Sequence, residues 1–136
     1  MEAGLHSWLS DAPDFMDRAK ANFALKAQEV IALMHGEVMD GIDEAAAHIE
    51  PMVHQAIGAY ALRKESGVRP LYQVQCKWLI DGIEIPVIGY LDFEWPEQID
   101  DLKTTLAAPS SPRVDHVAQE GMYMKARNKN AGQLVY

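Results

Sequence analysis

The spacing of hydrophobic residues along the chain changes near Pro70, from a period of three or four residues to a period of two. Before that point, the spacing is typical of helices that bury one face. After it, apolar and polar residues alternate as they do in strands. The first half of the chain is therefore predicted to be helical, and the second half is predicted to form a sheet.

Three helical segments are predicted in the first half. A short helix covers residues 2–9, and a longer one runs from a cap at Asp11 to about residue 35. The third spans about residues 38–64, with Gly67 as its stop signal. Pro51 leaves two interpretations open, because the helix either kinks at this residue or begins anew there.

The second half predicts the order strand, strand, strand, helix, strand. Asp81-Gly82 is a tight-turn signal between the first two strands, which cover about residues 72–80 and 83–95. Gly121 is expected to mark a close contact between the following helix and the sheet. The remaining elements are a strand at 99–106, a helix at 113–127 and a strand at 133–136. The fold class expected is α/β in the broad sense (α+β), with a helical N-terminal half followed by a mixed sheet.

The composition fits one globular domain of residues 1–136, divided into a helical part (1–68) and a sheet part (69–136). Hydrophobic residues make up 49% of the chain and charged residues 24%, as in soluble proteins. Since there is neither an apolar run of about 18 residues nor a signal-peptide pattern, no membrane partner is expected. Cys76 is the single cysteine, which excludes an internal disulfide framework and favours a cytoplasmic location.

The net charge of −8 argues against a nucleic-acid partner at first sight. The charge is uneven, however. Residues 1–60 hold ten acids and three bases, whereas residues 61–136 hold ten acids and nine bases. If some acids of the second half bind cations, that half becomes positive, so the acidity does not exclude a phosphate backbone as substrate.

Asp92, Asp101 and Lys103 are the candidate catalytic residues. Asp101 and Lys103 are two apart on a predicted strand and project to the same side, and Asp92 can join them if its strand pairs beside theirs. Two close carboxylates repel each other unless a cation lies between them, and oxygen ligands favour Mg²⁺ or Mn²⁺. Such a site suits phosphodiester hydrolysis, with Lys103 stabilising charge. The alternative is a solvated surface ion pair, which is the commoner explanation of a bare D-x-K triplet.

Three motifs in this order resemble those of the PD-(D/E)xK nuclease superfamily, in its RecB-like and phage-exonuclease branches. They are Gly89-Tyr90-Leu91-Asp92, Ile99-Asp100-Asp101-Leu102-Lys103-Thr104-Thr105 and Gln119-Glu120-Gly121-Met122-Tyr123. The resemblance covers about residues 70–136 and implies a restriction-endonuclease-like core of order αβββαβ. It also implies that Asp92, Asp101 and the main-chain carbonyl of Leu102 bind the metal, and that Lys103 is the catalytic lysine.

Further site residues follow from the same resemblance. Gln119 and Tyr123 are four apart on a helix, hence on one face, and in the family such residues line the active site and help to hold DNA. Glu2 is nominated as the third catalytic carboxylate and metal ligand, on an N-terminal helix. Glu44 and Glu50 are the alternatives to Glu2.

The resemblance implies a Mg²⁺- or Mn²⁺-dependent deoxyribonuclease, an exonuclease in phage-type DNA recombination or processing, acting in the host cytoplasm if phage-encoded. The implied partner is DNA. A homo-oligomer is also compatible with the resemblance, because some relatives form ring-shaped assemblies. The chain is expected to be shorter at both ends than its relatives. Two alternatives stay open: an inactive nucleic-acid-binding or assembly protein of the same fold, and an unrelated α/β domain with a surface D-x-K triplet.

Overall fold

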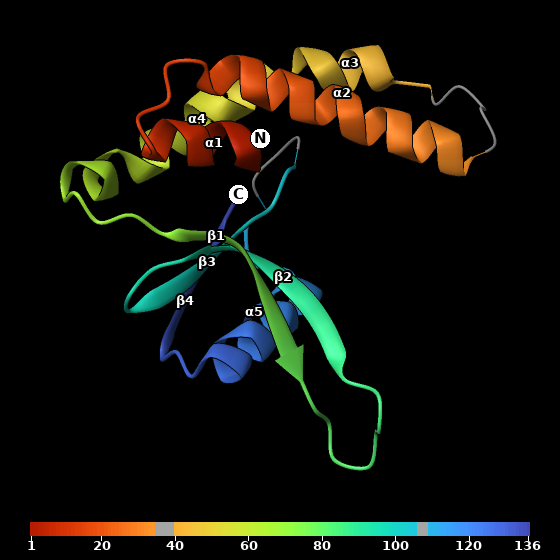
Figure 1. Ribbon diagram of the computed structural model, residues 1–136, viewed down its shortest axis with the longest axis vertical. Coiled ribbons are helices and arrows are strands. Elements are labelled where there is room, and N and C mark those ends of the chain that lie inside the picture. The colour runs from red at the N-terminus through yellow and green to blue at the C-terminus, as the bar shows by residue number, and fades with distance from the viewer. Residues whose placement is uncertain (35–39, 106–108) are drawn as a thin grey trace. The chain divides into compact units, whose positions relative to one another are not determined.

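The computed structural model describes residues 1–34, 40–105 and 109–136, which form two compact units, Met1–Gly67 and Val68–Tyr136 (Figure 1). The described part of the first unit contains helices, and the second unit contains a sheet and a helix. The predicted α+β class, with a helical first half followed by a mixed sheet, is confirmed. That the two units make one domain stays a prediction.

The helical unit packs through small and branched apolar side chains. Its elements are α1 (Glu2–Leu9), α2 (Phe15–Leu33), α3 (Ile42–Ala47) and α4 (Ile49–Glu65). Both α1 and α4 contact α2. Ala19, Ile49 and Val53 form a buried cluster between α2 and α4. Ile49 and Val53 are four residues apart, so α4 buries one face, as the helical spacing of its apolar residues predicts.

Two helix boundaries differ from the prediction. The second helix does not begin at a cap on Asp11, which has a φ of 61°, but at Phe15 after Asp14. A separate helix begins at Ile49, so Pro51 lies in its first turn, where a missing N–H costs no helical hydrogen bond. The interpretation in which Pro51 belongs to a new helix is therefore the closer one. The predicted boundaries near residues 35 and 38 lie outside the described residues.

The sheet unit has the predicted order of elements. These are β1 (Leu71–Trp78), β2 (Val87–Glu94), β3 (Gln98–Leu102), α5 (Val114–Arg127) and β4 (Ala131–Val135). The strands lie in the order β1-β2-β3-β4, with two antiparallel pairs followed by the parallel pair of β3 and β4. The helix α5 connects the parallel strands, as such a pair requires, and it contacts β1, β3 and β4.

The connection between β1 and β2 is longer than the predicted tight hairpin. Gly82 does lie in a turn, with a φ of 84°, in which the N–H of Ile83 donates to the carbonyl of Ile80 at 2.9 Å. The ladder, however, ends at the pair of Trp78 and Val87. Pro86 directly precedes β2, and its missing N–H prevents the ladder from continuing toward the turn.

The alternation of β2 breaks within the strand, which the sequence pattern did not predict. Leu91 packs with Tyr123 of α5, and Glu94 accepts a hydrogen bond from Arg127 of α5 at 3.0 Å. Alternation through residues 83–95 would place Glu94 on the face opposite Leu91. Residues three apart cannot share a face in a strictly alternating strand, so this expectation is wrong for Glu94. The break lies beside Gln73 of β1, whose φ of 52° is outside the strand region.

Close contacts between α5 and the sheet occur at two sheet glycines. A Cβ at Gly89 would lie 2.6 Å from Cε1 of Tyr123, and one at Gly132 would lie 2.9 Å from Cγ of Glu120. Around Gly121 there is open space, so the prediction of a close contact at that residue is wrong. Because Gly89 in β2 and Gly132 in β4 have no Cβ, the side chains of Tyr123 and Glu120 can pack directly against the sheet.

Among the described residues, no helix combines the length and the apolar character that crossing a bilayer requires.

Candidate active site

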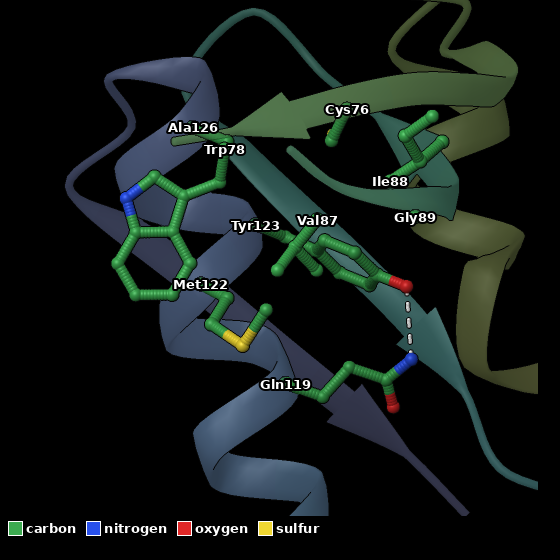
Figure 2. A pocket seen from close by; sticks show the side chains of 9 residues that line it. All are labelled: Cys76, Trp78, Val87, Ile88, Gly89, Gln119, Met122, Tyr123 and Ala126. Atoms are coloured by element: carbon green, nitrogen blue, oxygen red, sulfur yellow. Dashed lines mark hydrogen bonds between the residues drawn. The ribbon is translucent and has the colours of Figure 1, made fainter. Parts of the chain in front are cut away.

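The two motifs of the sheet unit are joined by direct contacts. Nζ of Lys103 lies 2.5 Å from Oδ2 of Asp101 and donates a hydrogen bond of 2.7 Å to Oε1 of Gln119. Nε2 of Gln119 in turn donates to the hydroxyl of Tyr123 at 2.9 Å, as Figure 2 shows. The D-x-K triplet at the end of β3 and the Q-x-x-x-Y stretch of α5 therefore form one chain of polar contacts, which we call the Asp101–Tyr123 chain.

Asp92 is held next to this chain by β3. Its Oδ2 accepts a hydrogen bond of 2.7 Å from the N–H of Leu102, the residue between Asp101 and Lys103. Its Oδ1 accepts one of 3.3 Å from Nε2 of Gln73. A main-chain N–H of β3 thus holds the carboxylate of Asp92, which lies on β2, at the middle residue of the D-x-K triplet.

The charges of this site act on the hydroxyl of Tyr123. Burial raises the pKa of the hydroxyl, and the hydrogen bond from Gln119 acts in the opposite direction. The charges of Asp101 and Asp92 raise this pKa further, while that of Lys103 lowers it. All three charged side chains therefore act on one hydroxyl, which keeps its proton at neutral pH.

The pair of Asp101 and Lys103 is largely removed from water. Their side chains are 6% and 16% exposed, so the pair is not the solvated surface ion pair that was the alternative interpretation. Removing one partner of such a pair leaves the other charge buried and costs about 3–5 kcal/mol. A buried pair of this kind is weak as a stabilising device, so stability alone does not account for its presence.

Glu120 is a buried carboxylate that the sequence interpretation missed. The residue is 6% exposed, and neither carboxylate oxygen has a well-formed hydrogen bond. Burial, followed by the charge of Asp101, raises its pKa to about 7, although the main-chain amide of Gln133 acts slightly in the other direction. Positions 120, 123, 124 and 127 share one face of α5, and this spacing could have shown that a glutamate falls on the buried face.

Gln73 was also missed, and no sequence signal could have identified it. A glutamine within a strand gives no hint of a left-handed backbone, which glutamine rarely adopts. Such conformations persist only where the surrounding structure enforces them, and they cluster at functional sites. At Gln73 the unusual backbone coincides with a side chain that holds the candidate ligand Asp92.

The remaining predicted residues are placed as follows. Glu2 lies in the first turn of α1, in the helical unit, so its role beside Asp92 stays a prediction. Among the alternatives, Glu50 is exposed and pairs with Lys20 at 3.0 Å, and Glu44 is exposed on α3. The carbonyl of Leu102 also stays a predicted ligand.

The donor chemistry fits an open site for a hard cation. Asp92 and Asp101 offer only oxygen, and Glu120 adds a third buried carboxyl nearby. Within the described ranges, no three His, Cys, Asp or Glu side chains are grouped closely enough to enclose a metal. Mg²⁺ is usually held by one or two carboxylates and completes its shell with water and substrate phosphate. Asp92 and Asp101 supply the two carboxylates that this requirement describes.

Comparisons with protein families, with curated proteins and with solved structures gave no match for this chain. The support for a function therefore comes from the residues and their arrangement. The Asp101–Tyr123 chain is its strongest element, because it joins two motifs that lie sixteen residues apart.

Proposed function

We propose that this protein is a divalent-metal-dependent DNA nuclease with a site of the PD-(D/E)xK type. The observation that carries the proposal is the Asp101–Tyr123 chain, with Asp92 held beside it. Packing of α5 on the sheet does not require these polar groups to meet. Their convergence, with two carboxylates and a lysine largely out of water, suits a reaction in which negative charge develops on a phosphate.

Asp92 and Asp101 would hold Mg²⁺ or Mn²⁺, with the Leu102 carbonyl and Glu2 as further proposed ligands. When bound, such an ion supplies polarisation of the phosphate and a water of lowered pKa. The protein's own groups orient the reaction around that position.

Lys103 would stabilise charge on the phosphate or orient the attacking water. An ammonium group has three N–H donors. One of them donates to Gln119, and the charge is paired with the carboxylate of Asp101. The same group can also donate to a phosphate oxygen or to water. Gln119 fixes the direction of this group, because its own amide is held by the Tyr123 hydroxyl. Tyr123 accepts from Gln119, so its own proton remains free to be donated to DNA.

The wider role is an exonuclease in phage-type DNA recombination or processing, acting in the cytoplasm and able to work as a homo-oligomer. These parts of the proposal rest on the resemblance of the three motifs alone.

The test is cleavage of linear duplex DNA with Mg²⁺, with Mn²⁺ and with EDTA. We expect cleavage only with metal, and a loss of roughly 10²–10³-fold in Asp101→Asn and in Lys103→Ala, the size typical of removing one key electrostatic group. Asp81→Asn, which changes an exposed turn acid of the same unit, is the matched control and should keep full activity. Cleavage without metal, or an active Lys103→Ala, would contradict the mechanism.

A second candidate is a DNA-binding protein of the same fold that lacks turnover. It would use the same Asp101–Tyr123 chain as a contact to DNA, without a bound metal. Calorimetry with Mn²⁺ separates the two candidates. The nuclease requires metal binding that Asp101→Asn abolishes, whereas the binding protein requires DNA affinity without it.

A further inference from the structure

A small apolar pocket lies between α5 and the ends of β1 and β2 that join in the long connection (Figure 2). Its volume is about 190 Å³. Its apolar walls include Trp78, Val87, Met122 and Ala126, and its lining also includes Gln119 and Tyr123. In Figure 2 the indole of Trp78 lies at one end, and the hydrogen bond between Gln119 and Tyr123 lies at the other. Gln119 and Tyr123 belong both to the pocket lining and to the Asp101–Tyr123 chain, so the pocket adjoins that chain.

The size of the pocket limits its occupant to one flat ring system. A cavity of about 150 Å³ is enough for benzene, whereas pockets for drug-sized ligands begin at about 300 Å³. The lining is mostly apolar, with the amide of Gln119 and the hydroxyl of Tyr123 as polar groups at one side. This combination suits a heteroaromatic ring that stacks on one face and has polar atoms at its edge.

An ammonium group lies near each end of the pocket. Nζ of Lys125 lies 5.2 Å from the centroid of the Trp78 ring. Nζ of Lys103 is bound to Gln119 at the other end and is also paired with Asp101. The charge of Lys125 beside an aromatic wall, with the proposed catalytic lysine at the far end, matches the alternation of phosphate and base along a nucleic-acid strand. An apolar peptide would gain nothing from these charges.

We propose that this pocket takes one unpaired base of a DNA strand, stacked on Trp78, next to the phosphate that is cut. The inference rests on the proposed nuclease function and specifies its substrate. A base that is paired and stacked in a duplex cannot enter a pocket lined by side chains without leaving the helix. The substrate is therefore a single strand or the frayed end of a duplex, and an intact duplex interior is excluded.

The first test is binding without cleavage, by fluorescence anisotropy with labelled 12-nucleotide DNA in EDTA. We expect Trp78→Ala to weaken binding of the single strand roughly tenfold, the effect typical of losing one base–aromatic stack. Trp78→Phe should retain most of the affinity. The matched control is Trp8→Ala in the helical unit, which removes another tryptophan that has a lysine, Lys64, 4.2 Å from its ring centroid. It should bind as the wild type does.

The second test needs no protein variant and therefore does not depend on whether Trp78→Ala folds. Each nucleotide of the strand is replaced in turn by an abasic site. One position should show the same loss as Trp78→Ala, and combining that position with the variant should cause no further loss. A flat scan, unchanged binding by Trp78→Ala, or equal affinity for a blunt, fully paired duplex would overturn the proposal.

The two proposals fail in different ways. If Trp78-dependent binding is found but metal-dependent cleavage is not, the base pocket stands and the nuclease function falls. If cleavage requires metal and Lys103 while the abasic scan is flat, the nuclease stands and the pocket falls.

Discussion

Replacing Glu120 by glutamine should stabilise the protein increasingly as the pH rises from 5 to 8. The carboxyl group is 6% exposed, lacks a well-formed hydrogen bond and lies near the charge of Asp101. These conditions disfavour its charged form. Glutamine keeps the shape of the side chain but cannot acquire the charge, so the substitution isolates the cost of ionisation.

The size of the effect follows from the pKa of Glu120, which burial raises from 4.5 to about 7. The folded state keeps the proton up to about pH 7, whereas the unfolded chain loses it near pH 4.5. Between these values the folded state binds more protons, so the free energy of unfolding falls as the pH rises. At about 1.4 kcal/mol per pKa unit, the full difference is roughly 3 kcal/mol, of which about 2–3 kcal/mol develops between pH 5 and 8.

The assay is urea unfolding of wild type and Glu120→Gln in EDTA at pH 5, 6, 7 and 8, followed by circular dichroism. Subtracting the free energy of unfolding of one protein from that of the other at each pH cancels the contribution of the titratable groups that both proteins share. An amide that finds no partner adds a cost that is the same at every pH, so the change with pH is the quantity to compare. Glu97→Gln, an exposed substitution between β2 and β3, is the matched control. A difference that stays constant from pH 5 to 8 would refute the reasoning.

Two further predictions concern the backbone around the site, and both are read from urea unfolding. Gly89→Ala should lower the free energy of unfolding by about 1–3 kcal/mol, because the new Cβ would lie 2.6 Å from the Tyr123 ring. Gly121→Ala, at an exposed position of α5, should raise the free energy of unfolding by up to about 1 kcal/mol. Equal effects of the two substitutions would contradict the packing described. At position 73, where φ is 52°, Gln73→Gly should be about 1 kcal/mol more stable than Gln73→Ala. Both variants lack the amide that bonds to Asp92, so their comparison isolates the backbone preference. Within a strand, the alanine variant is usually more stable than the glycine variant. Finding that order of stability here would show that the left-handed backbone is not enforced.

The periodicity of the sequence determined the type and order of the elements. A helix over residues 2–9 was predicted and found, as were the helix that ends at Arg127 and the order strand, strand, strand, helix, strand. These features depend on preferences within a few residues, so a window of the chain contains most of the information. The same window places Asp101 and Lys103 on one side of a strand, and the structure brings them into contact.

The connection between β1 and β2 shows where local signals are insufficient. Asp81-Gly82 forms a turn, yet the strands beside it do not pair up to that turn. Whether a strand continues depends on partners across the sheet, and the pattern of apolar residues at Ile83 and Ile85 does not contain that information.

What the sequence by itself determined is therefore the set of elements and the residue types available for chemistry, among them Asp92, Asp101 and Lys103. Only the tertiary structure decided which of these groups are buried from water and which of them are in contact. The contact of Lys103 with Gln119 and the buried carboxyl of Glu120 arise where α5 packs on the sheet. The left-handed Gln73 is exposed, and its side chain bonds to Asp92 of the neighbouring strand. The physical reason is that the energy of a charged group depends on how much water is removed from it and on which partners distant segments supply. The residues that neighbour the group in the sequence determine neither of these.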